Sequence, residues 1–202
     1  MPNWCANSLR LTTKTEEHVA LIIKIIVAIK DAQKKDENPR IFNIIKPMPD
    51  ELREVTKGYF ADDAERAEND KKRAECAEKY GYTDWYDWSL GEWGTKWDAS
   101  DVFHTVEPDG SLLLTFDTAW SPPIELYKTL EDMGFKVSAG FVEQGVNYIG
   151  YYVDGVDHTE EITYESNPEE DEDEDEYNDP FDLSEFFSTK YGMNHAPTHF
   201  GG

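Results

Sequence analysis

Basic residues are scarce in this sequence. Lysine and arginine together number 19 against 43 aspartates and glutamates, so the formal net charge is −24. Affinity for phosphate backbones and for anionic membrane surfaces comes from clustered Lys and Arg. We therefore expect no direct binding of nucleic acid and no membrane partner.

Cysteines and long apolar runs are also few. Cys5 and Cys76 are too few and too far apart for a disulfide framework, a Cys-x-x-Cys pair or an iron–sulfur site. The start lacks the basic and apolar regions of a signal peptide, and the most apolar run, Val19 to Ile29, is too short to span a bilayer. These absences predict a reduced, cytoplasmic protein.

Motifs of the common enzyme chemistries are absent. The sequence contains no G-x-S-x-G, no P-loop and no G-x-G-x-x-G. His195 and His199 are four residues apart, but Pro197 lies between them, and the other three histidines are isolated. We expect no metal and no cofactor, and a binding protein in preference to an enzyme.

Alternation of apolar and polar residues is the main pattern that is present, and it predicts strands. The alternating segments are Asn3–Thr12, Trp97–Val106, Ser111–Asp117, Phe135–Val142, Val146–Val153 and Val156–Tyr164. Ile41 to Ile45 is a further short strand candidate, and Pro47 and Pro49 would end it.

Helices are expected between these strands. Thr13 followed by Glu16 has the spacing of a capping box, so a helix should run from there to about Lys34. Its apolar residues cover most of its circumference, which predicts burial against a sheet. Pro122 and Pro123 should begin another helix that runs through Met133.

The order of these elements predicts an α+β fold with a mostly antiparallel sheet and helices on one face. Residues 50 to 80, rich in Ala, Glu, Lys and Arg, read as solvated helices within an insertion of about 50–93. We expect a body of residues 1–164 followed by an acidic low-complexity tail, residues 165–202.

Four of the six tryptophans fall between Asp84 and Asp98, among several acids. One interpretation is an aromatic core whose indole N–H groups find polar partners. The other is a pocket that stacks a flat ligand, and Asp84, Asp87 and Asp98 would also suit a cation or acid–base chemistry. The candidate ligand-binding residues are Asp84, Trp85, Asp87, Trp88, Trp93, Lys96, Trp97 and Trp120.

Five distinctive motifs follow one another along the chain: Met1–Asn7, Lys46–Leu52, Tyr80–Tyr82 with Asp84–Trp88, Trp93–Asp98 and Thr118–Pro123. In this order they resemble the Api92-like family, also called YubB-like or DUF1281, of phage and plasmid proteins. The similarity covers roughly residues 1 to 153. It implies a mobile-element origin and a ferredoxin-like fold, and it implies no reaction.

The tail combines charge with a short apolar motif. Glu169 to Glu176 is a run of eight acids, which repel one another and predict disorder. Behind it, Leu183, Phe186 and Phe187 would share one helix face, and Phe181 lies beside them. We expect these four residues to be candidates for binding a partner.

Two functions follow from these features. In the first, a non-enzymatic accessory protein of a phage or plasmid binds a host protein, for example one that binds nucleic acid, through an acidic surface that imitates phosphates. In the second, a binding protein or enzyme takes a small, nucleotide-like ligand at the Trp/Asp-rich segment 84–98.

Overall fold

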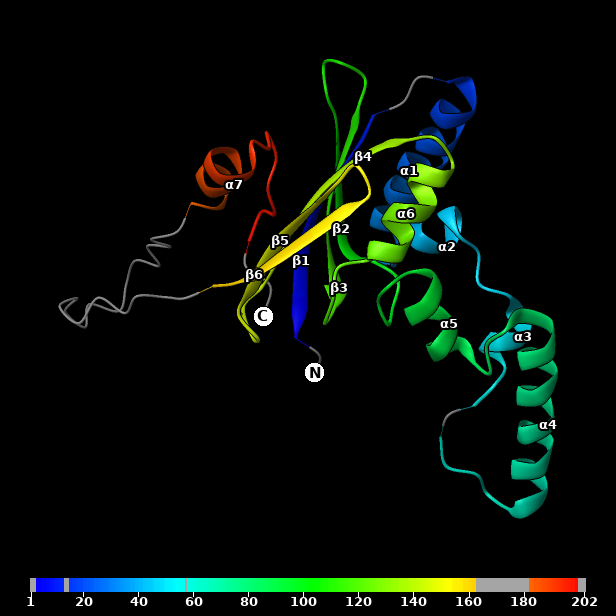
Figure 1. Cartoon of the computed structure of the whole chain (residues 1–202). Helices are drawn as coiled ribbons and strands as arrows, with labels where there is room; N and C mark the ends of the chain where they lie inside the picture. Colours follow the sequence, from blue (N-terminus) through cyan, green and yellow to red (C-terminus); the bar gives the residue numbers. More distant parts are fainter. Residues whose placement is uncertain (1–2, 13–14, 57, 163–181, 200–202) are drawn as a thin grey trace.

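Six strands form one antiparallel sheet in the computed structural model of the chain, which describes residues 3–12, 15–56, 58–162 and 182–199 (Figure 1). Their order across the sheet is β2-β3-β1-β4-β5-β6, and all neighbours are antiparallel. The strands are β1 (Trp4–Thr12), β2 (Ser100–Val106), β3 (Leu112–Ala119), β4 (Lys136–Glu143), β5 (Tyr148–Val153) and β6 (Val156–Glu161).

The first four strands have the ferredoxin-like arrangement. Helix α1 (Glu16–Lys35) lies between β1 and β2 in the chain, and α6 (Ile124–Asp132) lies between β3 and β4. Strand β3 separates β1 from β2, and β1 separates β3 from β4, so each β-α-β unit is split by one strand. Strands β5 and β6 extend the sheet beyond β4. The expected α+β fold with an antiparallel sheet is confirmed.

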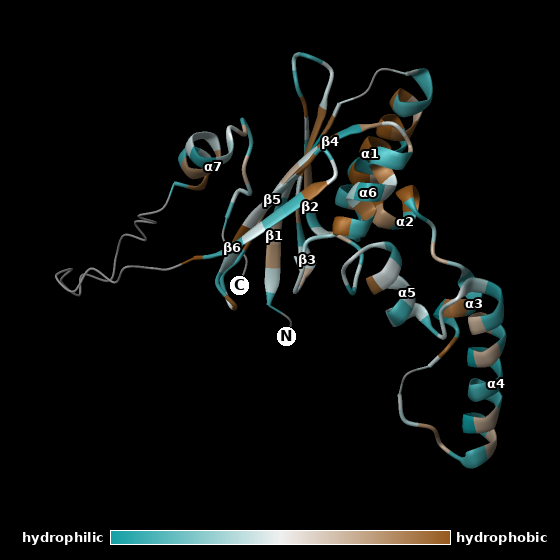
Figure 2. Ribbon diagram, viewed as in Figure 1, coloured by the Kyte–Doolittle hydropathy of each residue, from teal (hydrophilic) through white to brown (hydrophobic). Residues whose placement is uncertain are grey.

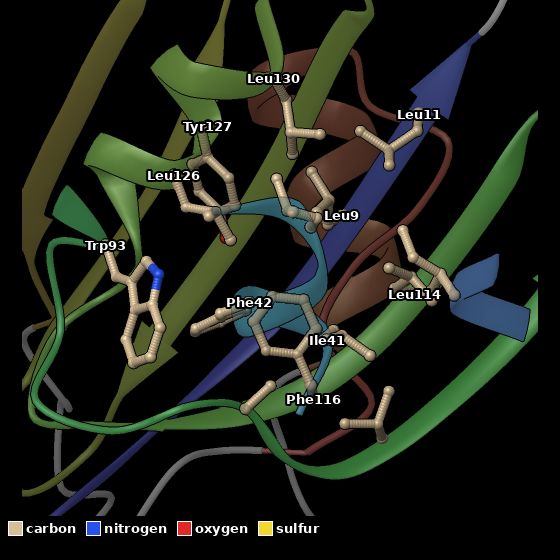
Figure 3. Packing of buried hydrophobic residues seen from close by; sticks show 14 of the residues in the cluster. Leu9, Leu11, Ile41, Phe42, Trp93, Leu114, Phe116, Leu126, Tyr127 and Leu130 are labelled. Atoms are coloured by element: carbon tan, nitrogen blue, oxygen red, sulfur yellow. The ribbon is translucent and has the colours of Figure 1, made fainter. Parts of the chain in front are cut away.

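Helices α1 and α6 cover one face of the sheet, where the main core lies (Figure 1). Leu9 and Leu11 of β1 both face these helices, whereas Ala6 faces the other way and belongs to a second cluster on the opposite face. Figure 3 shows Tyr127 of α6 and Phe116 of β3 within the main core. Successive residues of β1 thus point to opposite faces of the sheet, and both faces are buried.

Helix α1 buries one side only. Ile22, Ile25 and Ile29 point into the core, whereas Val19, Ile23 and Val27 are 45–55% exposed. The expected burial against the sheet is found on this side. The apolar residues of the other side stay exposed, because a helix lying on a sheet presents one stripe to it. The side chain of Thr15 caps the helix. Thr13, the expected cap, lies outside the described residues.

Residues Ile41–Ile45 form a short helix, α2, so the prediction of a strand here is wrong. A short run in which four of five residues are apolar does not distinguish helix from strand by its periodicity. The Asp98 carboxylate decides the outcome, because it accepts hydrogen bonds from the backbone N–H groups of Phe42 and Asn43 in the first turn. Phe42 is fully buried beneath it.

Between α2 and β2 the structure has α3 (Asp50–Arg53), α4 (Asp63–Tyr80) and α5 (Trp85–Glu92). Helices α3 and α4 fall within residues 50 to 80, where the composition predicts helix. Helix α4 projects away from the sheet and is mostly hydrophilic (Figures 1 and 2). Asn69 and Cys76 are its buried residues. The helix ends at Gly81, whose φ of +78° lies in the left-handed region that glycine favours.

Helix α7 (Leu183–Tyr191) lies on the other face of the sheet (Figure 1). There Leu183 and Phe187 pack with Ala6 and Val142 in the second cluster. The expectation of helices on one face holds for α1 and α6, and α7 adds a helix to the opposite face. The acidic run from 169 to 176 lies outside the described residues. None of the helices in the described ranges is long and apolar enough to cross a membrane.

Candidate functional site

A cavity of about 440 Å³ opens beside α2 and α5. This volume falls within the range of small-molecule sites. Its wall combines indoles, cations and amides from four separate stretches of the chain. The lining residues are Asn38, Arg40, Asn43, Met48, Arg53, Trp85, Trp93, Lys96, Trp97 and Asp98.

Two hydrogen-bonded contacts fix the aromatic wall. The Asp84 carboxylate accepts hydrogen bonds from the N–H groups of Tyr86 and Asp87, and so begins helix α5 directly before Trp85. The indole N–H of Trp93 donates to the carbonyl oxygen of Lys46 at 3.0 Å, and its ring is buried. Trp93 is therefore a rigid inner wall, and the half-buried Trp85 is more open.

The segment that carries Lys96 and Trp97 is tied to the end of β3. The Thr95 hydroxyl donates to the carbonyl oxygen of Ala119 at 2.9 Å, and the Ser121 hydroxyl donates to that of Gly94 at 2.9 Å. Gly94 has a φ of +86°, and a Cβ there would lie 2.9 Å from the Ile124 backbone nitrogen. Only glycine allows this close approach. Lys96 and Trp97 are consequently held at the cavity by the anchors at the two residues before them.

Asp98 lies at the floor of the cavity and is half-buried. Its carboxylate oxygens accept hydrogen bonds from the N–H groups of Phe42, Asn43 and Ala99. Burial raises the pKa of this carboxyl to about 6, although the three backbone donors and the nearby Arg40 act in the opposite direction. The charge of the cavity therefore changes just below neutral pH.

The cations of the cavity come from three different elements. Arg40 is the residue before α2, where its φ is +52°, Arg53 ends α3, and Lys96 follows α5. The Arg53 guanidinium donates to the Asn43 side-chain oxygen. Asp98 is the one carboxylate among the lining residues that the structure describes, so the cavity is locally cationic in a chain of net charge −24.

The structure brings together four of the eight ligand-binding residues expected from the sequence, since Trp85, Trp93, Lys96 and Trp97 line the cavity. Trp120 lies next to this group, with its ring 4.7 Å from the Lys96 ammonium.

Asp84, Asp87 and Trp88 have other roles. Asp84 is fully buried and pairs with Arg73 at 3.5 Å, Asp87 accepts from the Thr83 hydroxyl, and Trp88 packs in the main core. Asp98 binds backbone N–H groups. In the part of the chain that the structure describes, no three metal-ligating side chains gather in one place.

Arg40, Arg53 and the amides Asn38 and Asn43 were not expected from the sequence. The prediction of a strand at 41–45 gave no reason to place Arg40 beside the tryptophans. Arg40 and Arg53 reach the tryptophans only because α2 and α3 pack beside them. No pattern of neighbouring residues in the sequence predicts this packing.

The predicted partner-binding residues of the tail are used within the chain. Leu183 is 7% exposed and Phe187 is fully buried against the sheet, while Phe186 is half-buried. Phe181 lies outside the described residues. The apolar side chains of α7 therefore already have a partner in the second face of their own sheet.

The fold and the cavity define a class: a ferredoxin-like α+β protein with two added strands and a ligand-sized cavity lined by indoles and cations. No protein-family model matches the sequence, and no curated protein matches it. A solved structure is similar, the crystal structure of a protein api92 from Yersinia pseudotuberculosis, whose description names the family model DUF1281. It is 13% identical, over 81% of this chain and 99% of that one, with a TM-score of 0.44. A likeness this distant assigns no function.

Proposed function

We propose that this protein binds a small anionic ligand that carries a flat ring, of the nucleotide type, in the cavity beside α2 and α5. One observation carries the proposal: three cations and three indoles line the same ligand-sized cavity. The role is recognition, without a metal or a resident cofactor.

The cations explain why the ligand is anionic. Most of the surface of a chain with net charge −24 repels anions, so a group of Arg40, Arg53 and Lys96 concentrates the favourable field at one place. Guanidinium groups present several N–H donors in a fixed plane, which suits a phosphate or carboxylate. Asn38 and Asn43 line the same cavity and help to hold its wall: the Asn38 amide donates to the carbonyl oxygen of Ala99, and the Asn43 oxygen accepts from Arg53.

The indoles explain why the ligand has a flat ring. Trp85 and Trp97 are partly open to solvent and can stack on a base, whereas Trp93 is held against the floor by its hydrogen bond to Lys46. Stacking of a base on an aromatic side chain contributes about 1–3 kcal/mol and tolerates different bases. We therefore expect binding of several nucleotides with modest discrimination.

Thermal unfolding with and without adenosine monophosphate, uridine monophosphate or inorganic phosphate tests this proposal. A ligand that binds only the folded protein raises the melting temperature, and above its Kd the stabilisation grows with the logarithm of the ligand concentration. We expect a shift with both nucleotides and a smaller shift with phosphate. Arg40→Gln with Arg53→Gln should weaken nucleotide binding at least about tenfold, because hydrogen bonds to charged groups contribute about 1.5–3 kcal/mol each.

Arg66→Gln is the matched control, since Arg66 is an exposed arginine of α4 outside the cavity. Its affinity should equal that of the parent protein. The proposal fails if neither nucleotide shifts the melting temperature at millimolar concentration, or if the cavity variant and the control bind equally well.

We also propose that the chain is an Api92-like (DUF1281) protein of a phage or plasmid and acts in the cytoplasm of the host. Support comes from where the resembling motifs lie. Trp93 bonds to Lys46, and the rings of Trp4 and Trp97 are 6.1 Å apart, so separate motifs meet at the cavity. Maps of the genes that flank this one would test the origin.

A second candidate function is binding of a basic host protein, for example one that normally binds nucleic acid. The excess of 24 acids over bases favours it. Because α7 is anchored on the sheet, the test should neutralise the run 169–176 and leave residues 182–199 in place. Capture from host lysate should then weaken and should fall with salt. Capture that is unchanged and insensitive to salt would contradict this function.

A further inference from the structure

We infer that the ligand has two flat rings joined through a phosphodiester, and that Trp97 and Trp120, both next to the Lys96 ammonium, are separate stacking surfaces for them. This inference rests on the proposed function and specifies its ligand class. The ligand is a free dinucleotide or the end of a single strand.

Lys96 connects the two indoles. Its ammonium nitrogen lies 4.4 Å from the centroid of the Trp97 ring and 4.7 Å from that of Trp120. Both distances are within the range of cation–π attraction. A phosphate held by Lys96 would therefore lie close to both indoles, and a base stacked on each ring could be joined through it.

The backbone of Trp120 supports a role beyond packing. Its φ is +68°, a conformation that bulky side chains rarely adopt and that costs about 1–3 kcal/mol. Two hydrogen bonds hold it there: the Trp120 N–H donates to the carbonyl oxygen of Asn3 at 2.9 Å, and the Tyr148 hydroxyl donates to the Trp120 carbonyl at 2.7 Å. The strained backbone leaves 43% of this large residue exposed beside Lys96.

Trp97 is supported in a similar way. It is 38% exposed, and the ring of Trp4 lies at 6.1 Å with a 45° tilt. Lys96 and Trp97 line the cavity, whereas Trp120 lies outside its lining. A mononucleotide in the cavity therefore has no need of Trp120, and a second base has a place on it.

The charge of the chain limits the length of the ligand. Beyond the cavity and Lys96, a longer strand would meet a surface with a large excess of acids. A phosphate that is not neutralised by Lys or Arg keeps its counterions, so it adds nothing favourable to the binding free energy. We therefore expect affinity to rise from one nucleotide to two and not to rise further.

The test measures quenching of tryptophan fluorescence by adenosine monophosphate, a 5′-phosphorylated adenosine dinucleotide and an adenosine octanucleotide. The dinucleotide should bind about tenfold more tightly than the mononucleotide, because one more base stacks. If the octanucleotide binds as tightly as the dinucleotide, the natural ligand is the end of a single strand. If the octanucleotide binds more weakly, the natural ligand is a free dinucleotide. Either result supports the inference.

Trp120→Gly removes the ring and suits the left-handed backbone, and Trp120→Leu is a second variant that keeps an apolar side chain. Both should lose the tenfold gain for the dinucleotide and keep the mononucleotide affinity of the parent. Phe103→Ala, which removes an aromatic side chain that is 62% exposed on β2, is the matched control and should change neither affinity.

Equal affinities of the parent for one and two nucleotides would overturn the inference and leave the proposed function intact. So would an equal loss of both affinities in the Trp120 variants. If the parent binds no nucleotide of any length, the proposed function itself fails, and the inference fails with it.

Discussion

Ser8 and His195 are 187 positions apart in the sequence, yet the Ser8 hydroxyl and the His195 Nδ1 atom are 3.0 Å apart. The other ring nitrogen, Nε2, lies 3.1 Å from the hydroxyl of Ser138. His195 thus lies between β1 and β4 on the face of the sheet that α7 covers, and it holds the C-terminal segment against the body.

Protonation of His195 should loosen this attachment. Burial lowers the pKa of His195 to about 4, and the positive charge of Arg10 acts in the same direction. Because the folded-state pKa lies below the value of about 6.5 in the unfolded chain, the folded state loses stability as the pH falls through this interval. From about pH 7.5 to about pH 5 the loss from this one group is on the order of 2 kcal/mol.

Urea unfolding of the parent protein and of His195→Gln at both pH values measures this loss. Glutamine does not titrate, so the variant should lose less stability than the parent over the same interval. Parallel pH profiles for the two proteins would show that His195 does not titrate in this way.

His199 should behave in the opposite way. Its Nε2 atom lies 3.0 Å from an oxygen of Asp117, and the hydrogen bond to this carboxylate raises the pKa of the imidazole. The pair therefore stabilises the fold fully below the unfolded-state pKa and loses that contribution as the pH rises through the folded-state pKa. The difference in unfolding free energy between the parent and His199→Gln should shrink from pH 6 to pH 8. A difference that stays constant or grows would contradict the pairing.

Phe187 and Gly140 should show strong coupling. A Cβ at Gly140 would lie 2.5 Å from the Phe187 ring, and Phe187 is fully buried. Phe187→Ala should cost about 3–5 kcal/mol and Gly140→Ala about 1–3 kcal/mol. The double variant should cost less than the sum, because the new methyl group fills part of the space that the ring leaves. Chemical unfolding of the four proteins measures the cycle, and additive costs would contradict the contact.

The two sides of α1 should respond differently to truncation. Ile23 is 55% exposed and Ile25 is fully buried. Ile23→Ala should change the unfolding free energy by less than about 0.5 kcal/mol, and Ile25→Ala should cost about 2–5 kcal/mol. Similar costs at the two positions, measured by urea unfolding, would mean that the outer side of the helix is covered in solution.

Ligand affinity at the cavity should depend on pH through Asp98. Burial raises the pKa of this carboxyl to about 6, so below that pH it is neutral and the cavity is more cationic. Binding of an anionic ligand should therefore tighten as the pH falls from 7 to 5. A dinucleotide without a terminal phosphate is the suitable probe, because its phosphodiester does not titrate in this interval.

Asp98→Asn provides the control for this effect. Asparagine lacks the charge at every pH and keeps one oxygen acceptor for the backbone N–H groups of Phe42 and Ala99. Its affinity should be high and constant between pH 5 and pH 7. A variant that keeps the pH dependence of the parent would assign that dependence to another group.

Elements of the fold that are determined by neighbouring residues could be predicted from the sequence, and elements that depend on distant residues could not. The hairpin of β5 and β6 was expected from alternation on either side of Asp154-Gly155, and these two residues have φ values of +51° and +78°, as a type I′ turn requires. The helix at Ile41–Ile45 was missed, because the carboxylate that supports its first turn belongs to Asp98, 56 positions away.

The residues of the candidate site also fall into a group that the sequence predicted and a group that it did not. Trp85, Trp93, Lys96 and Trp97 were expected because they are dense in one short segment. Arg40 and Arg53 were not, since their place beside the indoles depends on the packing of α2 and α3. Leu183 and Phe187 were correctly seen as apolar residues on one helix face, but only their contact with β4 and β1 shows that the chain buries them itself.

The sequence by itself determined most strands and helices, the acidic charge and the segment that concentrates the aromatic residues, because periodicity, caps and turns act over a few neighbouring residues. The tertiary structure decided which of those residues meet. The cations beside the tryptophans, the contact of Lys96 with the Trp120 ring, and the place of His195 on the second face of the sheet all join residues distant in sequence. Packing brings these residues together, and local preference does not.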